Sequence, residues 1–329
     1  MSEPLLAVDD LKTYLFAEMG VIKAVDDISF TMNSGESLGL AGESGSGKTI
    51  TALSIMRLLP PIGKVVSGTI TVRDLGNVLD KTEEEMMKIR GSTIAMSFQD
   101  PMTYLNPVMN VGKQIAEAIM QHQNVSKAEA FQKSVQLMSR VRIPSPELRA
   151  MDYPHQMSGG MKQRILLAIG LSCDPKILIA DEPTTALDVI VQSDIIDLMI
   201  DLKRQTGVSV ILISHDLGII ARMCDKLLIL YAGQAMEIGP TKTIFAETMH
   251  PYTEALLESV PRLDWNGRRL KMIKGSIPTL ISPPSGCRFH PRCSHATETC
   301  RKEIPKMENI GKAHLTACHH WRKLLSDKA

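Results

Sequence analysis

Short apolar runs separated by turn residues mark the start of the chain. Apolar stretches fall at 5–8, 24–25 and 28–30, and a polar turn, Asn33-Ser-Gly35-Glu36, follows them. Runs of this kind, bounded by turn signals, predict antiparallel strands. A further strand is predicted at 68–73, beyond the helix-breaking pair Pro60-Pro61.

From residue 94 onwards, strand patterns alternate with helix patterns. Buried strands are predicted at 94–98, 177–180 and 208–213. Apolar residues recur at helical spacing over 111–140, 161–173 and 189–205. Strands that alternate with helices favour a mainly parallel sheet covered by helices, and 111–140 is expected to be a helical insertion between strands. The predicted fold class is therefore α/β.

A glycine-rich turn connects a buried run at 38–41 to a helix predicted from Ile50 to Leu59. It fits the pattern G-x-x-x-x-G-K-[ST] in the strand–loop–helix context that a phosphate loop requires. Glycines let backbone N–H groups turn inward around a phosphate, and the helix dipole adds to the attraction. Lys48 can reach the β- and γ-phosphates, and the Thr49 hydroxyl can ligate Mg²⁺. The nucleotide-binding candidates are Gly42, Ser44, Gly45, Gly47, Lys48 and Thr49.

Polar residues follow three of the predicted strands. Asp181 and Glu182 end the strand at 177–180, where ligands gather in open α/β sheets. Asp181 can hold the hydration sphere of Mg²⁺, and Glu182 can polarise an attacking water as general base. Gln99 and His215 follow two other strands, and each alone would be read as a loop residue.

Two further features could touch a nucleotide. Ser158-Gly159-Gly160 precedes a predicted helix, where free N–H groups can bind an anion, although a serine-capped turn is the commoner meaning of this tripeptide. Tyr14, or alternatively Phe16, could stack on a nucleobase or could simply fill the core.

Charge and hydropathy exclude several classes of protein. The 37 basic and 36 acidic residues leave a net charge of +1, so no overall field favours nucleic acid. No apolar run reaches the length that crosses a bilayer, about 18 residues. The first residues, MSEPLLAVDD, lack the basic and apolar segments of a secretion signal, so a cytoplasmic protein is expected.

Four of the six cysteines crowd the last 43 residues, together with five of the nine histidines. In a reducing compartment such a cluster favours metal binding over disulfides. Spacing alone leaves the metal open, because four thiolates suit zinc or an iron–sulfur cluster and the paired C-x₂₋₄-C of zinc sites is missing. The candidate ligands are Cys287, Cys293, Cys300 and Cys318.

The order of these motifs resembles that of the ATP-binding cassette (ABC) ATPases. Met157-Ser-Gly-Gly-Met161 resembles the cassette signature, and Ile177 to Asp188 resembles the Walker B strand with its D-loop. The stretch from Phe98 to Pro107 resembles the Q-loop. The resemblance covers nearly the whole chain. It implies a P-loop NTPase core with an antiparallel β subdomain and an inserted helical subdomain at about 100–160.

The resemblance also implies roles for the candidate residues. ATP would lie between two cassettes arranged head to tail. Glu182, His215 and Gln99 would be catalytic, with Gln99 joining Thr49 on Mg²⁺. Ser158, Gly159 and Gly160 would face the ATP of the partner cassette, and Asp188 would lie at the dimer seam.

The C-terminal part resembles the extension of oligopeptide and dipeptide importer ATPases. The matching stretches are His250-Pro-Tyr-Thr253 and the segment from Pro278 to Cys293, so an ATPase domain at 1–250 and an extension at 251–329 are expected. This resemblance implies an ATP-hydrolysing motor for peptide uptake, peripheral to the cytoplasmic face of the membrane. It also implies a [4Fe–4S] cluster on the four clustered cysteines.

Such a motor would need partners, because the chain has no predicted span. Two permease subunits docking near Gln99 to Asn106, a second and paralogous ATPase, and an extracytoplasmic solute-binding protein are expected. Relatives serving nickel, glutathione or oligosaccharides leave the solute open. A soluble cassette protein acting on nucleic acid is the alternative class, but the chain has no heptad run or basic patch. A small-molecule kinase would not explain Ser158 to Gly160 or His215.

Overall fold

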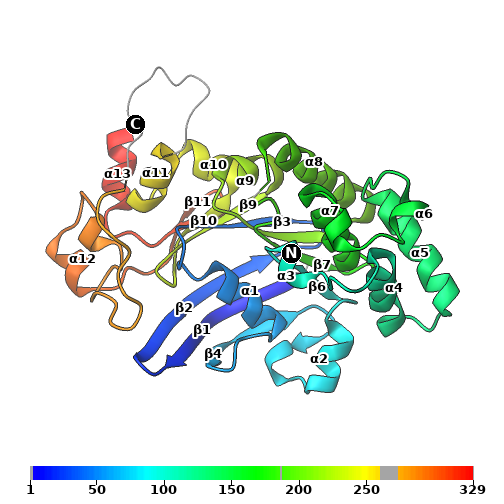
Figure 1. The fold of residues 1–329 in the computed structure, drawn as a ribbon. Helices are drawn as coiled ribbons and strands as arrows, with labels where there is room; N and C mark the ends of the chain where they lie inside the picture. Colours follow the sequence, from blue (N-terminus) through cyan, green and yellow to red (C-terminus); the bar gives the residue numbers. More distant parts are fainter. Residues whose placement is uncertain (1–2, 186, 260–272, 329) are drawn as a thin grey trace. The chain divides into compact units, whose positions relative to one another are not determined.

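The computed structural model describes residues 3–185, 187–259 and 273–328, and Figure 1 colours the chain by residue number. The chain divides into two compact units. The first comprises residues 1–32, 37–79 and 214–329, and the second comprises 33–36 and 80–213.

An antiparallel sheet opens the first unit, with the strand order β2-β1-β4-β5. Its long hairpin pairs Leu6 with Met32 at one end and Ala17 with Gly20 at the other. The predicted antiparallel strands are confirmed, but they are longer than the apolar runs because polar residues on the outer face continue the pairing. The strands are β1 (Leu6–Ala17), β2 (Gly20–Met32), β4 (Gly63–Val72) and β5 (Gly76–Asn77).

The phosphate-loop strand β3 (Ser37–Ala41) lies in a second sheet of the same unit and is buried along its whole length. It pairs in parallel with β9 (Lys226–Tyr231), which pairs antiparallel with β10 (Gln234–Pro240). Helix α9 (Leu217–Met223) packs tightly on β3: a Cβ atom at Gly39 would lie 2.7 Å from Ile220 Cγ2. A glycine is therefore needed in the middle of this strand.

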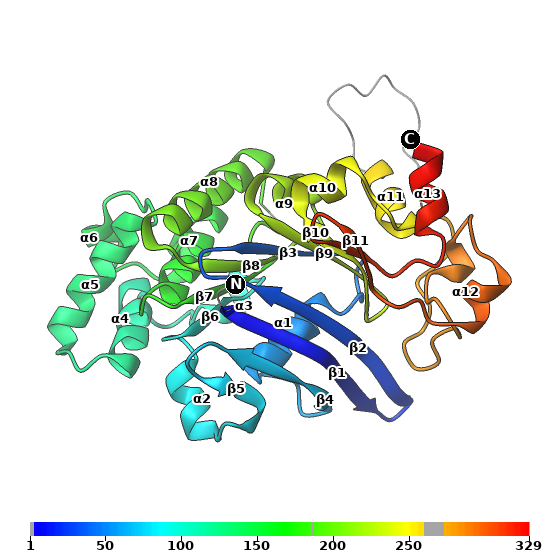
Figure 2. The same cartoon turned by 180° about the vertical axis from the view of Figure 1, so that it is seen from behind.

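The C-terminal segment continues this sheet rather than forming a sheet of its own. Strand β12 (His314–Thr316) pairs antiparallel with β10, and β11 (Glu308–Gly311) pairs with β12, giving the order β11-β12-β10-β9-β3. Figure 2 shows these C-terminal elements from behind, in orange and red. The helices here are α10 (Thr241–Ala246), α11 (Pro251–Glu258), α12 (Glu298–Lys302) and α13 (Trp321–Lys328), with a short 3₁₀ turn η3 (His290–Arg292).

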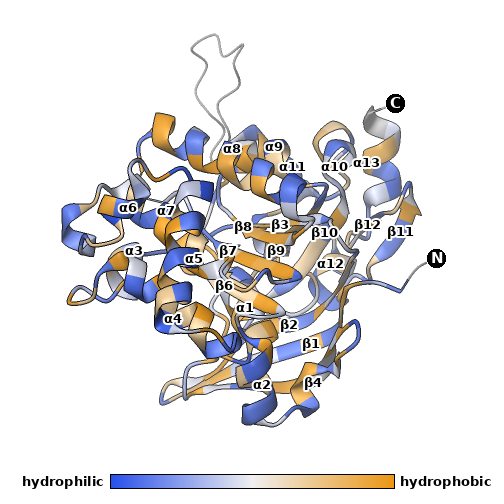
Figure 3. Cartoon of the chain, turned by 90° about the vertical axis from the view of Figure 1, so that its right-hand side faces the viewer, coloured by the Kyte–Doolittle hydropathy of each residue, from blue (hydrophilic) through white to orange (hydrophobic). Residues whose placement is uncertain are grey.

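The second unit contains the parallel strands of the predicted α/β region. Strand β7 (Ile177–Asp181) pairs with β6 (Ile94–Ser97) on one side and β8 (Ser209–Ile213) on the other. All residues of β7 and β8 are buried, and Figure 3 colours these strands mainly as hydrophobic. Helices α7 (Gly159–Gly170) and α8 (Val189–Thr206) follow the predicted helical patterns.

The predicted helical insertion is confirmed, but it is not one continuous helix. It forms α4 (Val111–His122) and α5 (Lys127–Arg140), flanked by short α3 (Pro101–Tyr104) and α6 (Pro146–Arg149). A new helix, α5, begins after Ser126 because Ser126 and Glu129 form a reciprocal capping box. The unit also contains α2 (Glu83–Ile89). Within the described residues, no helix has the length and apolar character needed to cross a membrane.

Candidate active site

The phosphate loop adopts backbone angles that only glycine takes without strain. Gly42, Gly45 and Gly47 have φ values of 147°, 76° and 106°. A Cβ atom at Gly42 would lie 2.1 Å from Leu230 O, and one at Gly47 would lie 2.5 Å from Ala24 O. Backbone of the same unit therefore packs closely against both ends of the loop, which precedes α1 (Lys48–Met56).

Lys48 is folded back across this loop. Its Nζ donates to Gly42 O at 2.8 Å and to Glu43 O at 3.0 Å, and the residue is 7% exposed. Ser44, Gly45 and Thr49 are exposed, so the face that a phosphate would approach is open to solvent. The backbone conformation and the charge at the start of α1 suit a phosphate group.

Tyr14, the predicted base-stacking residue, is hydrogen-bonded to a side chain of the neighbouring strand β2. Its hydroxyl donates to Asp26 Oδ1 at 2.7 Å. Burial, followed by this hydrogen bond, raises the pKa of Tyr14 to about 12. Phe16, on the same strand, is 48% exposed. Stacking on a base stays a prediction for either ring.

His215 lies in the exposed turn that precedes α9. The next residue, Asp216, caps that helix by accepting from the backbone N–H groups of Gly218 and Ile219. The cap fixes the turn on which the His215 side chain is presented. His215 and the phosphate loop both belong to the first unit.

In the second unit, three side chains meet at the end of β7. Gln99 Nε2 donates to Glu182 Oε2 at 3.0 Å, and Thr185 Oγ1 donates to the same oxygen at 2.9 Å. Glu182 has a positive φ of 45°, and its N–H donates to Ile213 O. Asp181 beside it is 3% exposed. The structure thus brings Gln99, one of the site candidates, to the acidic pair, whereas no sequence signal pointed to Thr185.

The Ser-Gly-Gly segment and Asp188 are neighbours in this unit. Ser158 caps α7 by accepting from Met161 N at 3.3 Å, and Asp188 caps α8 by accepting from Val191 N at 3.0 Å. A Cβ atom at Gly160 would lie 2.6 Å from Val191 Cγ1. The two helix starts therefore pack closely, with Ser158 and Gly159 exposed to solvent.

The four clustered cysteines line one small pocket in the first unit, with about 20 Å³ of free space. Burial raises the pKa of Cys287 to about 11 and that of Cys318 to about 12, and it also raises the pKa of Cys293. In the part of the chain that the structure describes, no group of three or more His, Cys, Asp or Glu residues is arranged to hold a metal ion. The pocket also includes His250, His290, His295, His319 and His320.

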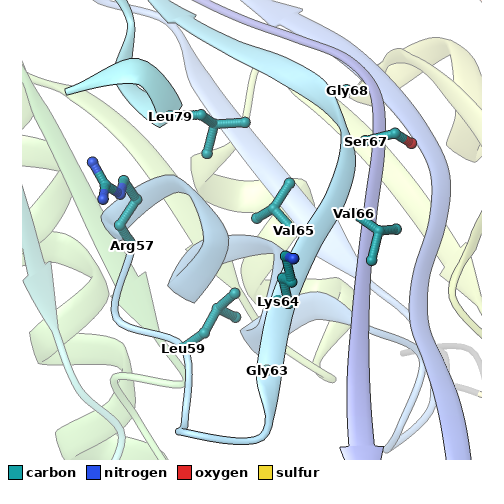
Figure 4. A pocket seen from close by; sticks show the side chains of 9 residues that line it. All are labelled: Arg57, Leu59, Gly63, Lys64, Val65, Val66, Ser67, Gly68 and Leu79. Atoms are coloured by element: carbon teal, nitrogen blue, oxygen red, sulfur yellow. The ribbon is translucent and has the colours of Figure 1, made fainter. Parts of the chain in front are cut away.

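A larger pocket, of about 500 Å³, lies elsewhere in the first unit, between the end of α1 and β4 (Figure 4). Arg57, Lys64 and Leu79 are among its lining residues, and none of the phosphate-loop residues lines it. It is therefore not the nucleotide site.

Comparisons with known proteins agree with this geometry. Residues 25–185 match the family described as ABC transporter, and residues 236–300 match the family described as oligopeptide/dipeptide transporter, C-terminal region. The dimeric structure of the ATP-binding cassette MJ0796 bound to ADP and Pi has a TM-score of 0.64 and 24% identity, covering 72% of this chain and 98% of that one. The structure of cbiO1 from Clostridium perfringens has a TM-score of 0.64 and 27% identity, covering 75% of this chain and 92% of that one.

Curated relatives are similar over almost their full length. The probable peptide ABC transporter ATP-binding protein y4tR of Sinorhizobium fredii is 47% identical, covering 97% of this chain and 95% of the relative. The oligopeptide transport ATP-binding protein OppD of Salmonella typhimurium is 46% identical, covering 95% of this chain and 93% of the relative.

Fold and motifs together define an ABC ATPase, with its P-loop α/β core and antiparallel β subdomain. Within that class, the chain belongs to the family of ATP-binding proteins of oligopeptide and dipeptide ABC transporters.

Proposed function

We propose that this chain is the ATP-hydrolysing motor of an importer for di- and oligopeptides. One observation carries the proposal: a match to the ABC transporter family and a match to the C-terminal region of oligopeptide/dipeptide transporters occur on the same chain. The solute could instead be nickel, glutathione or an oligosaccharide, since the motor itself does not select the solute.

Hydrolysis in this proposal depends on Glu182 as general base towards water. Gln99 and Thr185 donate to the same carboxylate oxygen, which fixes the orientation of the carboxylate at the end of β7. His215 would contact the γ-phosphate. Thr49, Gln99 and Asp181 offer the oxygen ligands that Mg²⁺ prefers, and the ion would neutralise charge on the phosphates.

The ATP site is proposed to be completed by a second cassette, most simply a paralogue. Ser158 and Gly159 are exposed and Gly160 is half-buried at the start of α7, where N–H groups and the helix dipole can face a partner's ATP. Asp188 caps α8, whose first turn packs against Gly160 at the start of α7. In this proposal Asp188 would lie at the interface between the two cassettes. The isolated chain should therefore bind ATP and hydrolyse it poorly.

The remaining partners would be two permease subunits and, indirectly, a solute-binding protein, with the motor on the cytoplasmic face of the membrane. The proposed docking surface spans Gln99 to Asn106. Met102 and Tyr104 are 66% and 50% exposed there, and Tyr104 stacks on Phe98 with ring centroids 4.1 Å apart. The stacked pair gives this exposed segment a defined shape.

The four-cysteine pocket is proposed to hold a [4Fe–4S] cluster. Four thiols around one pocket fit the ligand set of such a cluster. The buried thiols must lose protons on binding, because their raised pKa values keep them neutral at pH 7. A structural staple for the extension is the simplest role.

Transport is tested with the assembled complex in proteoliposomes. Glu182→Gln should abolish ATP-driven uptake of a peptide mixture, and Lys312→Gln, which alters only an exposed ion pair with Glu247, should not. Unchanged ATP turnover by Glu182→Gln would contradict its role. Uptake of nickel, glutathione or an oligosaccharide with no peptide uptake would reassign the solute. Anaerobic purification tests the cluster, because a colourless protein with one zinc per chain would overturn it.

A further inference from the structure

The second residue of the phosphate loop, Glu43, is held by the C-terminal part of the chain. Its backbone N–H donates to Tyr252 Oη at 2.9 Å. Its carboxylate accepts two hydrogen bonds from Arg292, at 2.6 Å from Nη1 to Oε2 and 3.1 Å from Nη2 to Oε1. All three residues belong to the first unit, and Arg292 is 249 positions from Glu43. Both the backbone and the side chain of Glu43 are thus fixed from outside the loop.

The side chain of Arg292 is buried and is held by several partners besides Glu43. Its side chain is 4% exposed, and its Nε donates to Lys274 O at 3.0 Å. Nη1 also reaches Tyr231 Oη at 3.3 Å, and the guanidinium lies 5.7 Å from the centre of that ring. A planar fork that binds a carboxylate in two places while stacking on an aromatic ring is a geometry that lysine cannot reproduce.

Tyr252 is equally constrained. It is fully buried, and its ring packs 4.6 Å from Tyr231 and 5.2 Å from Phe289. Phe289 lies between Cys287 and Cys293 in sequence, and Arg292 immediately precedes Cys293. The segment 287–293, which lines the four-cysteine pocket, therefore carries Arg292, and its Phe289 packs on Tyr252.

Glu43 also sets the position of the phosphate-binding lysine. Lys48 Nζ rests on the carbonyl oxygens of Gly42 and Glu43. Rotation of the peptide before Glu43 would break the Tyr252 hydrogen bond and move the Gly42 carbonyl on which the ammonium lies. A loop that is ordered before ATP arrives does not lose conformational entropy when ATP binds, which strengthens binding.

We propose that Arg292 and Tyr252 are positioning residues of the ATP site, which hold Glu43 and with it the phosphate loop in the nucleotide-binding conformation. The extension is then part of the nucleotide-binding machinery, and a disturbance of the four-cysteine pocket changes ATP affinity through the segment 287–293. The proposal rests on ATP binding by this chain and does not depend on which solute is transported.

The test measures the dissociation constant of MgATP on the purified full-length chain by calorimetric titration. Tyr252→Phe removes only the acceptor of the Glu43 N–H and keeps the ring. Arg292→Lys keeps the charge and loses the fork. Each should weaken MgATP binding by about five- to 150-fold, the usual range of coupling between sites. Lys312→Gln, in the same extension, is the matched control and should bind as the wild type does.

Two further readouts separate positioning from plain stabilisation. Amide hydrogen exchange at residues 43–48 should be faster in Tyr252→Phe than in the wild type, while exchange in β9 stays the same. In the assembled complex KM for ATP should rise, with little change in kcat at saturating ATP. Folded Tyr252→Phe and Arg292→Lys proteins that bind MgATP with the wild-type constant would overturn the proposal. An absence of peptide uptake would contradict the proposed function and leave these binding shifts intact.

Discussion

His314 Nε2 lies 2.7 Å from Glu237 Oε1 in the interior of the first unit, where the two side chains are 2% and 0% exposed. The same carboxylate oxygen accepts from Met249 N at 2.7 Å. His314 belongs to β12 and Glu237 to β10, so this pair joins the C-terminal strands to the sheet that carries the phosphate loop. Breaking a buried pair leaves an uncompensated polar group in the interior.

The first prediction follows from that pair. His314→Leu should lower the free energy of unfolding by about 3–5 kcal/mol, because Glu237 stays buried without its partner. The double variant His314→Leu/Glu237→Leu should lose less than the single one. Urea unfolding measures both, with Lys312→Gln as the exposed control in the same extension. A double variant less stable than His314→Leu would contradict this account.

The second prediction compares two glycines of the phosphate loop. Both have a positive φ, but a Cβ atom at Gly47 would lie 2.5 Å from Ala24 O, whereas one at Gly45 would meet nothing within 4 Å. Gly45→Ala carries only the strain of the left-handed region, about 1–2 kcal/mol. Gly47→Ala must also displace backbone, so its MgATP binding should fall well below that of Gly45→Ala. Gly76→Ala, with a similar φ of 74° and open space around it, is the control outside the loop. Equal losses for Gly45→Ala and Gly47→Ala in a binding titration would refute the clash.

Local chemistry explains what the sequence could predict. The phosphate loop, the acidic end of β7 and the serine before α7 each depend on residues within about a dozen positions of one another, so pattern and turn signals were sufficient. The break between α4 and α5 was missed, although the Ser126–Glu129 capping box is visible in the sequence. That error came from following apolar spacing alone.

Long-range pairing is what the sequence could not predict. In the phosphate-loop pattern Glu43 stands at a position open to any residue, and no local signal connects it to Tyr252 or Arg292. The pairing of β12 with β10 likewise joins residues almost 80 positions apart. Such contacts are selected by tertiary packing, because either strand alone fits many partners.

The third prediction concerns the close approach of α7 and α8. Gly160→Ala places a Cβ atom 2.6 Å from Val191 Cγ1, at a branched side chain with little freedom to move away. The signature segment must then shift. Displacement of a binding group by about 1 Å can cost about 100-fold in rate, so ATP turnover of the assembled complex should fall steeply. Val191→Ala should be close to wild type alone and should recover much of the turnover when combined with Gly160→Ala. If it gives no recovery, the steric contact is not the cause.

The last prediction concerns pH and the buried His250. Its Nδ1 accepts from Tyr252 N at 3.1 Å, so the ring is neutral, and burial lowers its pKa to about 3. In the unfolded chain the pKa of a histidine is about 6.5. Between these values the unfolded state binds a proton that the folded state does not, so stability present above pH 6.5 is lost as the pH falls. The slope from this residue is about 1.4 kcal/mol per pH unit. His250→Asn retains an acceptor at the start of α11 and cannot be protonated, so the free energy of unfolding should depend less on pH between 6.5 and 4.5. His155→Gln, at an exposed site, should leave the wild-type slope unchanged. A His250→Asn slope equal to that of the wild type would show that the buried ring does not govern acid stability.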